Sequence, residues 1–207
     1  MSKITFIIPS IGRDTLQNTI KSLENQTNSN WNAIIIFDGC SSTIQTINPK
    51  IKIIQIEKLG TDNSAGLVRN EGIKLANTEW IGFVDDDDTI ANNYVETFYN
   101  ELLENDIDVI IFRMNHFHDI IYPLLETDNF YIANVGISFA MKKRIYEDIP
   151  FIPSDIEDYL LLNSIRENKY KMMISPFVRY FVRDILSNEE KDDYINNKII
   201  GNRVFIN

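Results

Sequence analysis

The sequence predicts an α/β fold in which a single, mostly parallel central sheet is flanked by helices. Short apolar runs alternate with helical patterns through the first half of the chain, an order typical of parallel βαβ units. The runs are nearly continuously apolar, as expected for strands covered on both faces. Three of them end in polar residues, which predicts a ligand site beyond the carboxyl ends of the strands.

Residues 3–9 and 33–38 are predicted as strands because both runs are short, apolar and rich in isoleucine. Residues 13–27 predict a helix between them, since apolar side chains recur along one helical face. A third strand over 51–56 follows, and residues 63–77 predict a helix that begins at a polar cap.

Residues 80–84 predict a fourth strand, which runs directly into the four aspartates Asp85–Asp88. A helix over 92–104 and a strand over 108–114 then repeat the βα pattern. Further along the chain, residues 155–168 predict a helix that begins with acidic residues, as the helix dipole favours.

No repeat, low-complexity linker or Gly/Pro-rich boundary divides the chain. Residues 1–183 are therefore predicted as one domain, and residues 184–207 as a helical C-terminal extension. Within the domain, residues 170–183 contain two β-like runs that Ser175-Pro176 separates.

The chain has 207 residues and a formal net charge of −10, which argues against nucleic-acid binding. The only cysteine, Cys40, excludes an internal disulfide and a cysteine-rich zinc site. No signal peptide is expected, and no apolar run approaches the ~20 residues that cross a bilayer. We expect a soluble, cytoplasmic protein without a transmembrane segment, which leaves a peripheral position at a membrane open.

The four consecutive aspartates are the strongest chemical feature of the sequence. Adjacent carboxylates repel one another, and a divalent cation such as Mg²⁺ or Mn²⁺ relieves that repulsion. Asp85 and Asp87 would point the same way from an extended segment. The alternative is a solvated turn in which Asp88 or Asn92 caps the next helix. A P-loop NTPase is not predicted, because no G-x-x-x-x-G-K-[ST] motif occurs.

Three other positions carry candidate chemistry. Asp38 ends the second strand and can accept hydrogen bonds from a base or a ribose, although this motif taken alone favours a simple Asp-Gly turn. Arg69 can steady the aspartates and reach a diphosphate, or pair with a surface glutamate. The segment Asp155–Tyr159 offers a carboxylate base whose proton affinity a neighbour, Glu157, would raise.

The ordered segments ITFIIPSIGR, AIIIFDG, NSAGLVRNEGIKLANTEWIGFVDDDD and IEDYLLL together resemble the family 2 glycosyltransferases of the GT-A fold. The resemblance covers residues 3–105 and 136–183. It implies that residues 1–105 form a nucleotide-binding half and residues 106–183 an acceptor half.

The resemblance implies a role for each matching residue on the donor side. Pro9 and Ser10 match the loop that touches the nucleoside, and Asp38 matches the acidic residue that recognises the base, typically uracil. Arg69 matches the arginine of the helix before the aspartates. The expected donor is a nucleotide-sugar, most simply a UDP-sugar.

The aspartates match the DxD motif of the family. Asp87 is the expected direct metal ligand, Asp85 is expected nearer the ribose and the metal, and Asp86 is grouped with the donor-binding residues. Asp158 matches the general base of the Glu-Asp motif. The family is typically inverting, uses Mn²⁺ or Mg²⁺, and transfers sugars to a glycan, lipid or protein hydroxyl.

Arg183 stands where relatives often have a metal-binding histidine, and arginine cannot ligate a metal. Two other functions therefore stay open. The first is a nucleotide-sugar-binding module without transfer activity. The second is a sugar-phosphate nucleotidyltransferase, although Ser10–Arg13 match a triphosphate-binding glycine loop poorly.

Overall fold

The computed structural model describes residues 4–42, 44, 48–61, 63–116, 120–184, 191–192, 194 and 201–206. The strands in this part of the chain are β1 (Ile4–Ser10), β2 (Trp31–Asp38), β3 (Ile51–Ile56), β4 (Trp80–Phe83), β5 (Thr89–Ile90), β6 (Val109–His116), β7 (Ile120–Tyr122), β8 (Phe139–Lys142), β9 (Met172–Phe181) and β10 (Val204–Ile206). They form one sheet in the order β10-β9-β6-β8-β4-β1-β2-β3, to which β5 and β7 are attached through β9 and β6.

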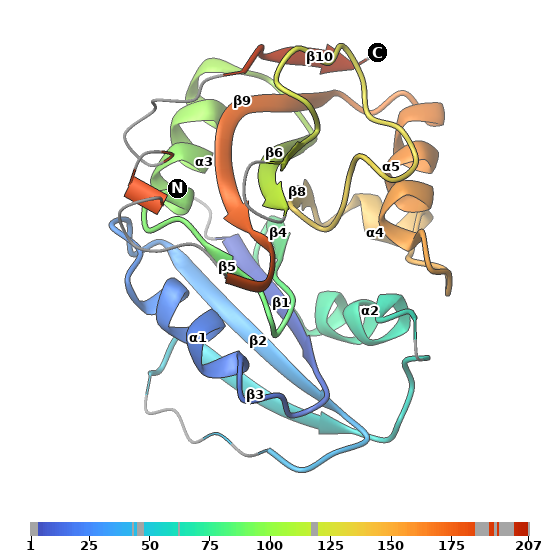
Figure 1. The fold of residues 1–207 in the computed structure, drawn as a ribbon. Coiled ribbons are helices and arrows are strands. Elements are labelled where there is room, and N and C mark those ends of the chain that lie inside the picture. The colour runs from blue at the N-terminus through green and yellow to red at the C-terminus, as the bar shows by residue number, and fades with distance from the viewer. Residues whose placement is uncertain are drawn as a thin grey trace.

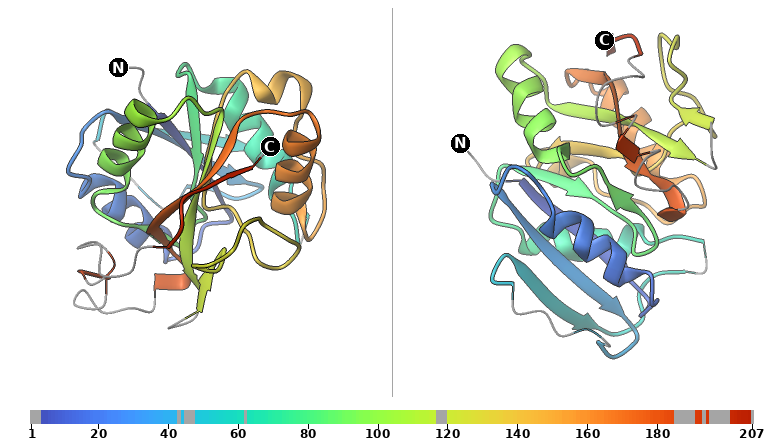
Figure 2. Two further views of the ribbon diagram at one scale, coloured as in Figure 1. Left: turned by 90° about the horizontal axis from the view of Figure 1, so that it is seen from above. Right: turned by 60° about the vertical axis from the view of Figure 1, so that its left-hand side comes forward.

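Helices cover both faces of this sheet. They are α1 (Leu16–Glu24), α2 (Gly66–Leu75), α3 (Tyr94–Glu104), α4 (Ile145–Asp148) and α5 (Glu157–Glu167), with a short 3-10 turn, η1, at Val182–Asp184. Figure 1 shows their arrangement around the sheet. Seen from above in Figure 2, α1 and α3 lie on one side of the sheet and α2, α4 and α5 on the other.

The predicted parallel sheet is confirmed in the first half of the chain. Strand β1 pairs in parallel with both β2 and β4, and β2 pairs in parallel with β3. The ends of β1, β2 and β4 therefore meet at one edge, because parallel strands share their direction. Beyond β4 the sheet is mixed, since β8 is antiparallel to both β4 and β6.

The second half departs from the sequence analysis in one element. Residues 172–181 form a single strand, β9, that passes through Pro176, instead of two runs separated there. Its parallel pairing with β6 shifts register near Arg113, and this irregularity accommodates a residue without an N–H donor. The carbonyl of Pro176 accepts a hydrogen bond from Gly201 N, 2.9 Å away.

The predicted helical extension over 184–207 lies largely outside the described residues. Of its described part, residues 191–192 and 194 are helical, but Val204–Ile206 form β10, antiparallel to β9. No helix in the described part of the chain is long and apolar enough to cross a membrane.

Two buried arginines join this C-terminal segment to the sheet. Arg113 donates to the carbonyl oxygens of Ser175 and Asn202, the latter at 3.0 Å. Arg179 donates to the carbonyl oxygen of Tyr194 at 3.3 Å. Burial lowers the pKa of each of these arginines to about 10. Backbone carbonyl oxygens thus replace some of the water that would otherwise solvate these guanidinium groups.

The core is a continuous apolar cluster built from both faces of the sheet. On one face, α2 approaches β1 and β2 so closely that a methyl group at Gly72 would stand 2.5 Å from Ile7 Cγ2 and 2.6 Å from Ile36 Cδ1. This close approach positions the beginning of α2, and with it Arg69, at the edge of the sheet.

We expect Gly72→Ala to lower the free energy of unfolding by about 1 kcal/mol, although alanine is the better helix former by about 1 kcal/mol. Overpacking against Ile7 and Ile36 costs about 1–3 kcal/mol and outweighs that gain. Urea unfolding measures the difference. The control, Lys74→Ala at an exposed position of the same helix, should stay within about 0.5 kcal/mol of the unmodified chain. A more stable Gly72→Ala variant would contradict the packing argument.

Candidate active site

A cavity of about 450 Å³ opens at the carboxyl edge of the parallel strands. It brings together most of the residues that the sequence analysis selected from separate segments, namely Pro9, Ser10, Asp38, Arg69, Asp85, Asp86 and Asp158. Asp87, the expected metal ligand, is not among the residues that line the cavity, although its neighbour Asp86 is. The cavity also contains residues that the sequence analysis did not select for the site, among them Arg13 and Lys58.

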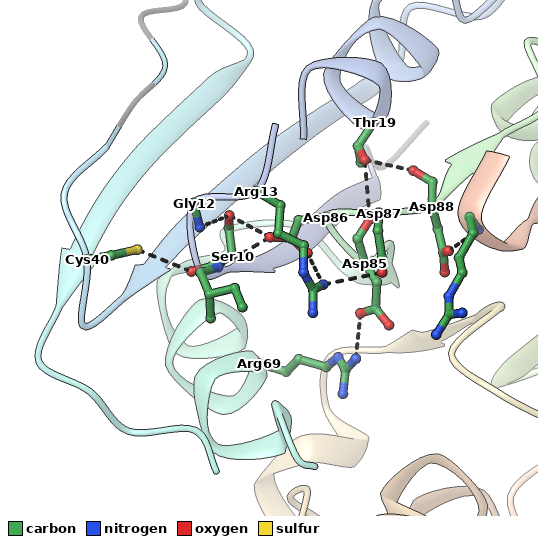
Figure 3. A network of polar contacts seen from close by, with 12 residues as sticks. Ser10, Gly12, Arg13, Thr19, Cys40, Arg69, Asp85, Asp86, Asp87 and Asp88 are labelled. Carbon is green, nitrogen blue, oxygen red and sulfur yellow. Dashed lines mark hydrogen bonds and ion pairs between the residues drawn. The ribbon is translucent and has the colours of Figure 1, made fainter. Parts of the chain in front are cut away.

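The four aspartates, called the acid loop below (Asp85–Asp88), do not have equivalent surroundings. The carboxylate of Asp86 is almost fully buried and faces the loop that follows β1 (Figure 3). It accepts hydrogen bonds from Ser10 Oγ at 2.8 Å, Ile11 N at 3.2 Å and Arg13 Nη1 at 2.6 Å. These contacts fix the Asp86 carboxylate, and Asp86, which the sequence analysis grouped with the donor-binding residues, also lines the cavity.

Asp88 is also engaged in internal contacts. Its carboxylate accepts hydrogen bonds from the Tyr180 hydroxyl and from Arg183 N, both at 2.7 Å. Thr19 of α1 donates to the carbonyl oxygen of Asp88, also at 2.7 Å. Burial, with repulsion from Asp85, raises the pKa of Asp88 to about 8. Asp88 thus fastens the acid loop to β9 and α1 and does not cap the next helix.

Arg69 connects the acid loop to the beginning of α5. Its Nη2 lies 2.6 Å from Asp85 Oδ1, while its Nη1 forms an ion pair with Glu157 and lies 3.8 Å from Asp158 Oδ1. Burial lowers the pKa of Arg69, but the three carboxylates outweigh burial and raise it above its ordinary value. The guanidinium therefore stays charged and compensates acidic groups from both halves of the chain.

Glu157 binds the amino-terminal end of α2. Its carboxylate accepts hydrogen bonds from Ser64 Oγ, from Ala65 N at 3.1 Å and from Gly66 N at 2.9 Å. Helix α2 has no side-chain cap of its own, and an anion at a helix amino terminus is favourable. The sequence analysis considered Glu157 only as a neighbour of the base, because a contact across 91 residues leaves no local pattern.

Asp158 follows Glu157 and faces the cavity with its side chain 24% exposed. Its Oδ1 is buried and has no hydrogen-bond partner among the described residues. Burial, together with repulsion from Asp85 and Glu157, raises the pKa of Asp158 to about 7, against the attraction of Arg69. A carboxylate that lines the cavity and has this pKa can accept a proton near neutral pH.

Asp38, the last residue of β2, lines the same cavity. It accepts hydrogen bonds from Lys58 Nζ at 2.8 Å, Leu59 N at 2.6 Å and Gly60 N at 3.1 Å. Burial raises its pKa, but these hydrogen bonds outweigh burial and hold the pKa of Asp38 below its ordinary value. A carboxylate and an ammonium group therefore stand side by side, an acceptor and a donor for a polar ring.

The residues of the acid loop can supply some, but not all, of the ligands of a divalent cation. The side chains of Asp85 and Asp87 are 33% and 29% exposed, and their ion pairs use one oxygen of each carboxylate. No group of three or more metal-ligating side chains exists among the described residues. Mg²⁺ commonly takes further oxygens from a bound phosphate, so two carboxylates do not have to complete its coordination.

Comparison with known proteins identifies the family of the chain. The family model described as Glycosyl transferase family 2 matches residues 5–156. TarP of Staphylococcus aureus, a poly(ribitol-phosphate) beta-N-acetylglucosaminyltransferase, is 32% identical over 54% of this chain and 36% of TarP. WfgD of Escherichia coli, a UDP-Glc:alpha-D-GlcNAc-diphosphoundecaprenol beta-1,3-glucosyltransferase, is 25% identical over 84% of this chain and 74% of WfgD.

Solved structures extend the likeness to the fold. TarS 1-349 of S. aureus in complex with UDP-GlcNAc has a TM-score of 0.69 and 19% identity, over 93% of this chain and 61% of that one. The expected GT-A fold is thereby confirmed. The chain spans less than half of the length of TarP and of two further curated relatives, the glycosyltransferases GlyG and GlyA of Streptococcus pneumoniae.

We expect Glu157→Gln to lower the free energy of unfolding by about 2 kcal/mol. The amide keeps the size of the side chain, but it has only one acceptor oxygen. The carboxylate accepts hydrogen bonds on both of its oxygens, from Ser64, Ala65, Gly66 and Arg69. Denaturant unfolding tests this expectation. Glu71→Gln, which alters an exposed pair on the same helix, is the matched control and should cost less than about 0.5 kcal/mol. Equal effects of the two variants would show that Glu157 does not anchor α2.

Proposed function

The chain belongs to glycosyl transferase family 2, and we propose that it transfers a sugar from a UDP-sugar to an acceptor hydroxyl, with inversion at the anomeric carbon. One observation carries the proposal. A single cavity is lined by Asp38 with Lys58, by Arg69 with Asp85, and by the carboxylate of Asp158. The three groups of chemistry that a nucleotide-sugar and its acceptor need, namely partners for a base, groups for a diphosphate site and a proton acceptor, are thus gathered in one cavity.

The part of the cavity around Asp38 and Lys58 favours uracil as the base. Uracil presents an N–H donor between two carbonyl acceptors, and Asp38 and Lys58 offer an acceptor beside a donor. Pro9 and Ser10 line the same cavity and would contact the nucleoside. The similar TarS structures with UDP and with UDP-GlcNAc are consistent with a uridine nucleotide as donor.

We propose that Asp85 and Asp87 hold a Mn²⁺ or Mg²⁺ ion together with the donor diphosphate. When bound, such a cation offsets charge on the departing diphosphate and aligns it. Arg69 keeps Asp85 in place from the protein side. The cavity-lining residues carry more acidic than basic side chains, so a dianionic nucleotide needs added positive charge there.

Asp158 would act as general base on the acceptor. The acceptor hydroxyl gives its proton to the Asp158 carboxylate, its oxygen forms a bond to the anomeric carbon, and the bond from that carbon to the diphosphate breaks. UDP leaves as the product. A single displacement of this kind inverts the anomeric centre. Glu157 and Arg69 would position the base and would not take the proton themselves, because each is already engaged.

The acceptor class is left as a glycan, lipid or protein hydroxyl. A UDP-release assay with a panel of UDP-sugars, with and without acceptor, separates transfer from the two other functions. Saturable binding of UDP-sugar without UDP release would favour a binding module. Pyrophosphate release from a nucleoside triphosphate and a sugar phosphate would favour a nucleotidyltransferase.

We expect Asp158→Asn to reduce turnover at least about 100-fold, because the amide cannot accept the acceptor proton. UDP affinity should change less than about threefold, since the donor contacts lie elsewhere in the cavity. In the unmodified enzyme the base must be deprotonated, so turnover should rise with pH through about 7 and then level off. A profile of kcat between pH 5.5 and 8.5 measures this, and a flat profile would contradict the assignment.

We expect Asp87→Ala to abolish the metal dependence of donor binding. The variant loses a carboxylate ligand, whereas Asp86 and Asp88 keep the acid loop in place through their own contacts. Calorimetric titration of UDP with Mn²⁺ and with EDTA measures the effect. Asp14→Ala, which removes an exposed aspartate of the neighbouring loop, is the control. Unchanged metal-dependent binding in Asp87→Ala would overturn the role of this residue.

A further inference from the structure

Arg13 places a guanidinium group between two consecutive carboxylates of the acid loop. Its Nη1 lies 2.6 Å from Asp86 Oδ1 and 3.4 Å from Asp87 Oδ2 (Figure 3). The side chain is 47% exposed and lines the cavity. Arg13 Nη1 therefore pairs with one buried carboxylate and with one that is more exposed, while the Arg13 side chain itself stays accessible to solvent.

The two contacts of Arg13 differ in how firmly the surroundings hold them. Asp86 is also held by hydrogen bonds from Ser10 Oγ and Ile11 N. Gly12 has a φ of +85°, so the chain turns between these donors and Arg13. Asp87 is 29% exposed, and its contact with Arg13 is the longer of the two. Arg13 can therefore give up Asp87 and still keep its shorter contact with Asp86.

Asp87 is also the aspartate to which the proposed function assigns the metal. A guanidinium nitrogen 3.4 Å from its carboxylate would repel a divalent cation that approaches the same carboxylate. This repulsion falls if Arg13 moves away from Asp87 or if further negative charge enters the cavity. A donor diphosphate supplies such charge, and a guanidinium binds phosphate oxygens with paired N–H donors.

We propose that Arg13 is an exchangeable counter-cation of Asp87, which neutralises this carboxylate when the cavity holds no donor and passes to the donor diphosphate when a divalent cation binds there. The proposal rests on the proposed function and deepens it by naming a positioning residue. It makes metal and nucleotide binding mutually dependent. The diphosphate draws Arg13 away from the cation, and the cation offsets the repulsion between the diphosphate and the acidic side chains of the cavity.

The test is calorimetric titration of Mn²⁺ alone, and of UDP in the presence of Mn²⁺, into the full chain and its Arg13→Gln variant. We expect Arg13→Gln to bind Mn²⁺ alone about three- to tenfold more tightly, because the repelling charge is gone. Its affinity for UDP with Mn²⁺ should fall at least about threefold. Unchanged or weaker binding of Mn²⁺ alone would overturn the proposal.

Lys52→Gln is the matched control for the change in net charge. Lys52 is exposed near the beginning of β3, opposite Ile34 of β2 and away from the carboxyl edge of the sheet. This variant should bind Mn²⁺ and UDP as the unmodified chain does. A Mn²⁺ affinity raised equally in Lys52→Gln and Arg13→Gln would overturn a specific role for Arg13.

A second variant, Arg13→Lys, keeps the test decisive if Arg13→Gln loses its fold. An ammonium group retains the positive charge, so Arg13→Lys should keep the weak binding of Mn²⁺ alone, while its single-point charge should weaken UDP binding. Tight Mn²⁺ binding in a folded Arg13→Lys would overturn the proposal. If the unmodified chain binds no UDP with Mn²⁺, the proposed function fails as well. If it does bind and only the Arg13 effects are missing, the failure belongs to this inference alone.

Discussion

The arrangement of the site depends on the ion pairs of the buried Arg69 guanidinium with acidic side chains. This guanidinium lies between Asp85, at the end of the parallel strands, and Glu157, at the beginning of α5. Without this positive charge, acidic groups from two distant parts of the chain would face one another across a buried space. The same group sets the surroundings of Asp158, whose pKa reflects burial and carboxylate repulsion against the attraction of Arg69. One cation thus holds the two halves of the cavity together.

The acid loop shows how identical residues acquire different roles. Asp86 and Asp88 turn toward protein donors and fasten the loop to β1 and β9, whereas Asp85 and Asp87 keep partly exposed carboxylates. The four residues form a turn that the hydrogen bond from Asp88 N to the Asp85 carbonyl oxygen closes at 3.2 Å. Two of the four carboxyl groups therefore maintain the shape of the loop, and the other two stay partly exposed.

The parts of the fold and of the site that could be predicted were those with local signals. Apolar runs ending in Asp38 and Asp85 located the edge of the sheet, Arg69 was selected from its place on the helix before the aspartates, and the resemblance to a known family singled out Asp158 within Asp155–Tyr159. Pro176 was misleading, because a register shift lets β9 continue through it. The contacts of Lys58 with Asp38 and of Glu157 with α2 could not be predicted, since they join residues 20 and 91 positions apart with no shared pattern.

The hydrogen bonds of Arg113 and Arg179 to the C-terminal segment affect how the chain can be shortened for expression. A truncation after residue 183 would follow the boundary suggested by the sequence, yet it would remove the carbonyl oxygens of Tyr194 and Asn202 that these guanidinium groups use. It would also expose the outer edge of β9, which β10 now covers. An uncovered strand edge invites pairing between molecules, so such a fragment would tend to aggregate.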